Sequence, residues 1–131
     1  MLVYVGRQTE RALGAGGTAA LYAVGAYVAA GGQWLAGPQS PVPMIGASGA
    51  ISALVGAYAL LYGQRRAQAF GPIPAGVAHV LWLAAGWTGV QLLIGATQPA
   101  GQPIAIAAHI GGFLGGLALA RPLLLARYRH A

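Results

Sequence analysis

Charged residues divide the chain into two long blocks that contain none. Residues 12–64 and 67–120 lack Asp, Glu, Lys and Arg, and every charge lies near the start, at Arg65 and Arg66, or near the end. Each block is more than twice the roughly 20 residues that one helix needs to cross a bilayer. Pro, Gly and Gln interrupt each block near its centre. Each block therefore predicts a helical hairpin inside a membrane.

Composition supports a membrane as the solvent for this chain. Of its 131 residues, 57% are apolar and only 6% are charged, whereas a soluble domain carries about a quarter charged residues. We predict an all-α membrane protein, a polytopic helical bundle of four transmembrane helices plus the tail of a preceding one. The expected spans cover residues 15–31, 48–64, 76–96 and 104–120, with 125 as the alternative end of the last.

The positions of the arginines predict the topology. The hairpins bring all seven to one face of the membrane, which the positive-inside rule identifies as cytoplasmic. Residues 6–14 are expected to form a short cytoplasmic turn in which Glu10 is solvated, and Met1–Val5 to be the tail of the preceding helix. A nucleic-acid partner is not expected, because no block of basic residues alternates with polar or aromatic ones. Arginine without lysine, with abundant Ala and Gly, hints at a bacterial cytoplasmic membrane.

One serine and one histidine are expected at similar depths in the membrane. Counted along helices from the arginines, Ser48 lies about 25 Å from the inner boundary and His109 about 18 to 27 Å. His79 and His130 are expected at the cytoplasmic side. Ser48 and His109 also lie in spans rich in small residues at four-residue spacing, which lets helices pack closely. These residues are Gly49, Ala53, Gly56 and Ala57 in one span, and Gly111, Gly112, Gly115 and Gly116 in the other.

A paired serine and histidine would permit nucleophilic catalysis. A neutral histidine is the usual base for a serine nucleophile, and the only carboxylate, Glu10, is expected on the opposite membrane face. The predicted unit is therefore a Ser48–His109 dyad, with N–H groups at the start of the Ser48 helix as donors to an oxyanion. Simpler alternatives exist for each part: Ser48 is a good N-cap residue, His109 can be a hydrogen-bonded residue between helices, and the glycines can serve packing alone.

Two motifs resemble the signatures of the rhomboid family of intramembrane serine proteases. Gly46-Ala47-Ser48-Gly49 matches the family pattern GxSG at the start of a transmembrane helix, and Ala108-His109-Ile110-Gly111-Gly112 with Gly116 matches AHxxGxxxG in the last core helix. The resemblance covers the whole chain, which we therefore describe as a partial rhomboid-like transmembrane domain over residues 1–131.

The resemblance implies an endopeptidase that cleaves transmembrane segments of other membrane proteins within the bilayer. Ser48 would be the nucleophile, His109 the general base and acid, and the main-chain N–H of Ser48 an oxyanion donor. Gly49, Gly112 and Gly116 would pack the two helices together. The span that carries Trp82 and Trp87 would be the mobile gate that the family is described as having. No metal or cofactor is implied.

The chain departs from the family pattern in two places. An HxxxN motif in the family's second helix completes the oxyanion hole, and this sequence begins where that helix ends. Because a lost oxyanion donor costs about 10² to 10³ in rate, we expect the chain alone to hydrolyse poorly, whether it is truncated or starts at an internal methionine. Four positions after the nucleophile, where some members have an aromatic residue, stands Ser52. Its hydroxyl is expected to donate to the Ser48 carbonyl.

Other classes of function fit the sequence less well. The main alternative is a catalytically inactive rhomboid-like protein that binds transmembrane segments as a chaperone or trafficking partner. A transport or channel fragment would need polar groups along several spans, and these spans have few. The sequence has no aspartate for an aspartyl dyad, and His109 without a second ligand cannot hold zinc.

Overall fold

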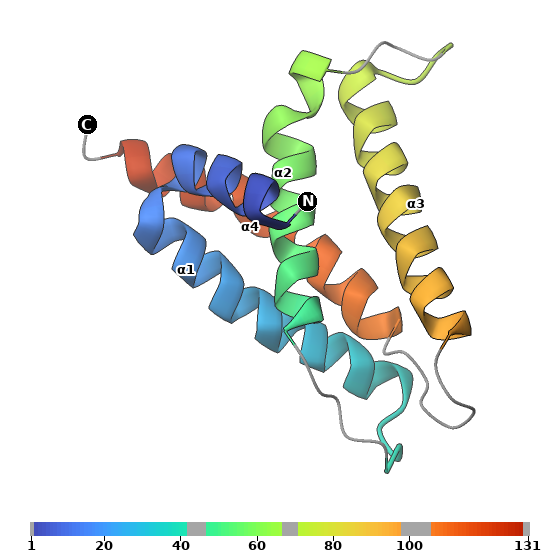
Figure 1. Ribbon diagram of the computed structural model, residues 1–131. Coiled ribbons are helices and arrows are strands. Elements are labelled where there is room, and N and C mark those ends of the chain that lie inside the picture. Colours follow the sequence, from blue (N-terminus) through green and yellow to red (C-terminus); the bar gives the residue numbers. More distant parts are fainter. Residues whose placement is uncertain (1, 42–46, 67–70, 98–105, 130–131) are drawn as a thin grey trace.

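The described part of the chain is a bundle of four α-helices. The computed structural model describes residues 2–41, 47–66, 71–97 and 106–129. Its helices are α1 (Leu2–Ala36), α2 (Ser48–Arg66), α3 (Ala75–Ala96) and α4 (Ile106–Tyr128). The helices alternate in direction, so the last turns of α1 and α3 and the first turns of α2 and α4 gather at one end of the bundle (Figure 1). We call this end the Ser48 end.

Helix lengths and composition confirm the prediction of a helical membrane protein. Among the described residues, three segments are long and apolar enough to span a bilayer: Val3–Ala36, Ala75–Ile94 and Ile106–Tyr128. The apolar part of α2, Ser48–Gly63, is shorter. The sequence predicted this short span, and its position in the bundle explains why the short length is tolerated.

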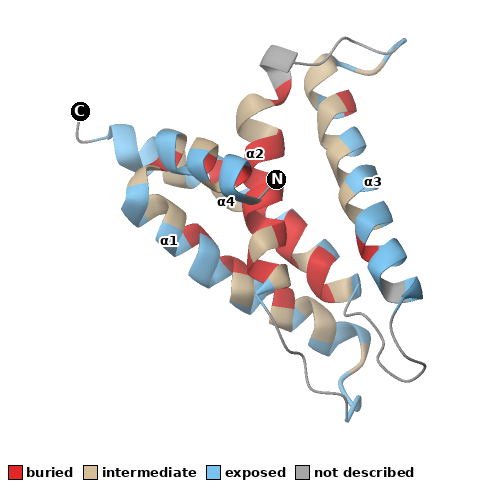
Figure 2. Cartoon of the chain, in the orientation of Figure 1, coloured by how far each residue is buried: buried red, intermediate tan, exposed pale blue. Residues whose placement is uncertain are grey.

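Helix α2 is the central element of the bundle. Every residue from Ser52 to Ala59 is buried, and α1, α3 and α4 all contact this helix. Figure 2 shows the buried residues concentrated along α2 and the facing part of α4. A helix covered by neighbours meets protein instead of lipid over most of its length, so it does not need to match the full hydrocarbon thickness.

The expected cytoplasmic turn at residues 6–14 is wrong, because residues 2–13 are helical. Val5, Thr9 and Leu13 recur every four residues and are buried, so they form one packed face of this segment. The Thr9 hydroxyl donates to the Val5 carbonyl at 2.9 Å. The change of direction occurs only at Gly14, whose φ of 77° and ψ of 168° are not helical and belong to a region that is essentially restricted to glycine.

Two hydrogen bonds fix this first segment at the end of the bundle opposite Ser48. The Tyr62 hydroxyl, near the end of α2, donates to the Gln8 carbonyl at 2.9 Å. Arg127 Nη1, near the end of α4, donates to the Arg11 carbonyl at 2.7 Å. Glu10 lies between these two attachment points in the sequence and is exposed. The only acid of the chain is therefore far from Ser48.

Two helices extend beyond their expected ends. Helix α1 continues to Ala36 instead of ending at residue 31, because Gly32 is a packing residue: a Cβ there would lie 3.0 Å from the Ala107 carbonyl oxygen of α4. Helix α4 runs to Tyr128 with Pro122 inside it. The second predicted tip at residues 98–103 lies outside the described residues.

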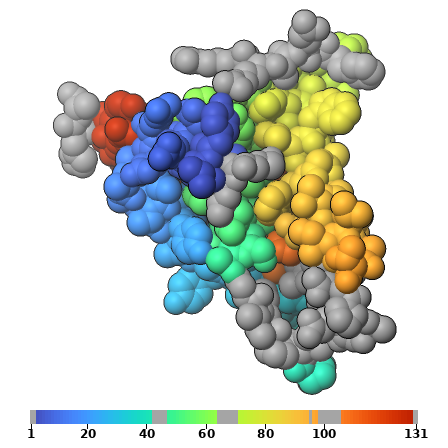
Figure 3. Space-filling view, in the orientation of Figure 1, coloured from blue at the N-terminus to red at the C-terminus, as the bar shows by residue number. Residues whose placement is uncertain are grey.

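Helix α3 is the least enclosed of the four. It packs mainly against α2, and its contact with α4 is much smaller than its contact with α2. In Figure 3, α3 covers one side of the molecule along its whole length, and only a small part of α4 is visible between α2 and α3. Large apolar side chains on several sides of α3 are exposed, as expected for a helix in contact with lipid: Val77, Leu81, Trp82, Val90, Leu92 and Leu93.

Candidate active site

Ser48 is the first residue of α2. The Ile51 N–H donates to the Ala47 carbonyl at 3.0 Å, so Ala47 occupies the N-cap position and Ser48 the first helical position. The Ser48 side chain is half-buried and does not occupy the N-cap position that the simpler alternative gave it. The N–H groups of Ser48, Gly49 and Ala50 precede the first helical hydrogen bond and have no partner within their own helix.

Glycines bring α2 and α4 into backbone contact beside Ser48. A Cβ at Gly112 would overlap the Gly49 carbonyl oxygen, and a Cβ at Gly116 would overlap the Ala53 carbonyl oxygen. On the other side of the contact, a Cβ at Gly49 would lie 3.8 Å from the Ala108 carbonyl oxygen. Gly49 follows Ser48, and Ala108 precedes His109. The helix contact therefore places the serine and the histidine on adjoining turns at the Ser48 end.

His109 is buried, with 7% of its surface exposed, and its side chain has no hydrogen bond. Neither Nδ1 nor Nε2 has a partner in the described part of the chain. No hydrogen bond therefore joins His109 to Ser48 in this structure. A ring nitrogen buried without a partner loses its hydration without compensation. Both ring nitrogens of His109 can therefore still form a hydrogen bond.

Ser52 links the first turn of α2 to α3. Its hydroxyl donates to the Ser48 carbonyl at 2.9 Å, which confirms the bond predicted from the sequence. The same oxygen accepts a hydrogen bond from Trp87 Nε1 at 2.8 Å. An indole ring from α3 thus reaches α2 at the position of Ser52. The pair of bonds determines which face of α3 turns toward α2.

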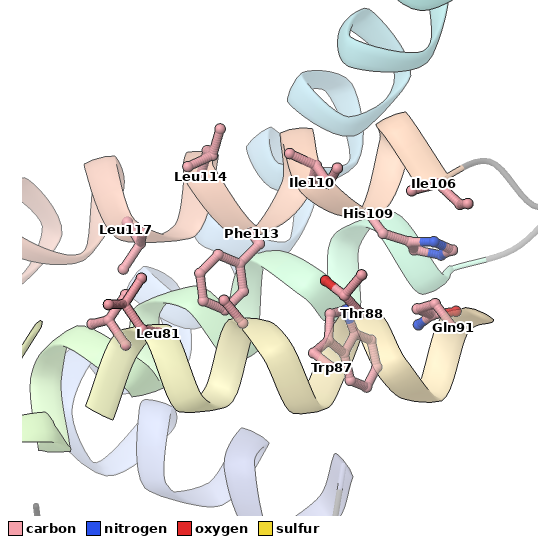
Figure 4. A pocket seen from close by; sticks show the side chains of 12 residues that line it. Leu81, Trp87, Thr88, Gln91, Ile106, His109, Ile110, Phe113, Leu114 and Leu117 are labelled. Atoms are coloured by element: carbon pink, nitrogen blue, oxygen red, sulfur yellow. The ribbon is translucent and has the colours of Figure 1, made fainter. Parts of the chain in front are cut away.

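A cavity of about 300 Å³ lies between α3 and α4. Its lining is mainly apolar, and its polar members include His109, Thr88 and Gln91. Figure 4 shows the His109 ring extending from α4 toward the end of α3 that carries Gln91. Gln91 is buried, with 7% of its surface exposed, on a helix that is otherwise mostly exposed. Ser48 does not line this cavity.

The remaining candidates from the sequence lie elsewhere. A Cβ at Gly63 would lie 3.3 Å from the ring of His79, which places this histidine near the far end of α2, about 22 Å along the helix from Ser48. Gly46, the first residue of the serine motif, and His130 lie outside the described residues. Sequence reasoning did not assign Trp87 or Gln91 to the site. Their four-residue spacing on one helix face was the available signal.

Fold and site together define a helical membrane protein with a serine and a histidine on adjoining, glycine-packed helices. A comparison with protein-family models identifies its family: the model described as Rhomboid domain matches residues 1–126. The chain belongs to the rhomboid family. A comparison with curated proteins found no match, and neither did a comparison with solved structures.

Proposed function

We propose that this protein is an intramembrane serine endopeptidase that cleaves transmembrane segments of other membrane proteins. Ser48 Oγ attacks the carbonyl carbon of the scissile peptide bond, while His109 accepts the serine proton and then delivers it to the leaving amine. Water hydrolyses the resulting acyl-enzyme with His109 again as base. The main-chain N–H of Ser48 donates to the oxyanion.

The observation that carries this proposal is the unpartnered His109 beside the glycine contact that holds Ser48. A base that serves a serine needs a free ring nitrogen, and both nitrogens of His109 are free of hydrogen bonds among the described residues. Ser48 is the first residue of α2, and the N–H groups of this first turn have no hydrogen-bond partner within the helix. A rotation of the His109 side chain toward α2 is the change that would complete the dyad.

A second function is also consistent with the structure, because no hydrogen bond joins Ser48 and His109. A rhomboid-like protein without catalysis would hold a transmembrane segment against the same helices and release it uncleaved. The two functions differ in the reactivity of one hydroxyl group, since an activated serine reacts with a fluorophosphonate and an ordinary serine does not.

The test is labelling of the purified full-length protein in detergent with a fluorophosphonate probe. We expect labelling in the wild type and in Ser40→Ala, a control that removes a loop serine, and none in Ser48→Ala or His109→Ala. Cleavage of a reconstituted transmembrane substrate should follow the same order. Absence of labelling in folded wild-type protein, together with capture of an intact transmembrane segment, would instead establish the binding function.

The surroundings of the site are consistent with a membrane-embedded substrate. The chain contacts the lipid bilayer through its exposed apolar helices, and the cavity beside His109 is almost entirely apolar. We infer a multi-pass protein of a bacterial cytoplasmic membrane, with the arginine-bearing end and the C-terminus in the cytoplasm. The positive-inside distribution of arginines supports this orientation. No metal or cofactor is part of the proposed mechanism.

A further inference from the structure

The dyad proposed above lacks a group to orient its histidine. In serine hydrolases a third residue usually accepts a hydrogen bond from the base, and so selects its tautomer and ring position. The only carboxylate of this chain, Glu10, lies at the opposite end of the bundle beside the attachments of Gln8 and Arg11. Any orienting group must therefore be an uncharged acceptor near His109.

Among the described residues, Gln91 is the side chain that meets this requirement. Gln91 and His109 line the same cavity from facing helices, and Figure 4 shows the Gln91 side chain and the His109 ring at the same end of it. Each is 7% exposed. Thr88 also lines the cavity, but a helical threonine hydroxyl can satisfy itself on the carbonyl four residues earlier. The longer Gln91 side chain can present its carboxamide oxygen to the cavity that the His109 ring also lines.

The bond between Trp87 and Ser52 keeps α3 rotated so that Gln91 faces the cavity. Trp87 and Gln91 are four residues apart, so they lie one above the other on the same helix face. Because Trp87 Nε1 is held by Ser52 Oγ at 2.8 Å, rotation of α3 about its axis is restricted. Gln91 is then one turn nearer the Ser48 end, on the cavity that His109 lines.

We propose that Gln91 is the positioning residue for His109. No direct bond joins the two side chains in this structure, so Gln91 Oε1 accepts the N–H of one imidazole nitrogen through a water molecule in the cavity or after a side-chain rotation. This leaves the other nitrogen as the acceptor for the Ser48 proton. The cavity has room for such a water, which requires only about 30 Å³. The bond would satisfy a His109 ring nitrogen that is otherwise buried without a partner among the described residues, which apolar surroundings favour strongly.

The role of Gln91 in catalysis rests on the proposed function, but its pairing with His109 can be measured without any activity. Full-length protein labelled with ¹⁵N-histidine in micelles gives long-range ¹H–¹⁵N correlations that report the tautomer, with His109→Ala identifying the signal. We expect one tautomer in the wild type and in Gln91→Glu, which keeps an acceptor oxygen at the same distance. Gln91→Leu should show a mixture of both tautomers.

A matched control separates pairing from general packing. Gln33→Leu makes the same substitution at a glutamine of α1 whose Oε1 is buried without a partner among the described residues and which does not line the cavity. It should leave the His109 tautomer unchanged. If His109 has the same tautomer ratio in Gln91→Leu as in the wild type, the inference is refuted, regardless of the measured proteolytic activity.

Kinetics then test the consequence for hydrolysis. Gln91→Leu should lower kcat about tenfold or more, as loss of the outer hydrogen-bond partner does for a metal-bound histidine, with KM within twofold of the wild type. Gln91→Glu should retain most of kcat, whereas a packing role would favour Leu over Glu in an apolar cavity. A tautomer change in Gln91→Leu with an unreactive wild-type Ser48 would uphold the pairing and overturn only the proposed protease function.

Discussion

Replacement of Gly112 by alanine tests whether close backbone packing holds α2 and α4 in place. The new methyl group would overlap the Gly49 carbonyl oxygen, and it would lie 3.1 Å from both the Gly49 carbonyl carbon and Ser52 Cβ. Ordinary carbon contacts are about 3.5 to 4.0 Å, so even these two neighbours would have to move by about 0.4 to 0.9 Å. Because two of the three obstacles are backbone atoms, the clash cannot be relieved by a rotamer change.

The cost can be isolated by comparison with a glycine that has open space around it. A Cβ at Gly86, on α3, would meet nothing within 4 Å. Both replacements gain the same helix propensity, about 1 kcal/mol, so the difference between them is the overpacking cost of about 1 to 3 kcal/mol. This corresponds to about a 5- to 150-fold difference in the unfolding equilibrium constant.

The assay is reversible unfolding of the two variants in mixed micelles, followed by tryptophan fluorescence. We expect Gly86→Ala to be at least as stable as the wild type and Gly112→Ala to be the less stable variant by the stated amount. Fluorophosphonate labelling should fall in Gly112→Ala as well, because the displaced helices carry the serine and the histidine. Equal stability of the two variants would refute the claim that the glycine contact is tight.

Three further predictions follow from the fold. Gly14→Ala should destabilise the protein by about 1 to 3 kcal/mol, because the backbone at this position adopts a conformation that alanine rarely takes. Gly16→Ala, at a position with open space around it, should not destabilise the protein, and the unfolding midpoints of the two variants test this difference. A double-mutant cycle of Trp87→Phe and Ser52→Ala should give a coupling free energy of about 0.5 to 1.5 kcal/mol, as for one neutral hydrogen bond, and additive effects would show that the bond contributes nothing. A C-terminal tag should resist protease added outside intact cells and be digested in inverted vesicles; the opposite result would reverse the topology.

The sequence alone determined the class of fold and the two residues of the proposed dyad. Long uncharged blocks admit only helices in a bilayer, because every backbone group must be satisfied inside the membrane. With so few polar side chains in the spans, Ser48 and His109 could be selected by counting residues along helices. Ser52 was also predictable, since a serine four residues into a helix has a carbonyl within reach of its hydroxyl.

The tertiary structure decided what depended on contacts between distant segments. Residues 6–14 were predicted to form a turn, yet residues 6–13 are helical because Val5, Thr9 and Leu13 pack as a buried face. The first span was predicted to end just before Gly32, yet Gly32 lies within α1 and packs against α4. Local composition cannot distinguish a glycine that ends a helix from one that lets two helices touch.

The surroundings of the histidine were likewise beyond the reach of sequence reasoning. That Trp87 reaches Ser52, and that Gln91 shares a cavity with His109, depends on the rotation of α3 about its axis. Helix α3 is apolar on nearly all sides, so its sequence has little amphipathic pattern to indicate which face turns inward. Depth in the membrane follows from counting along one helix, whereas the facing of side chains follows only from how the helices pack.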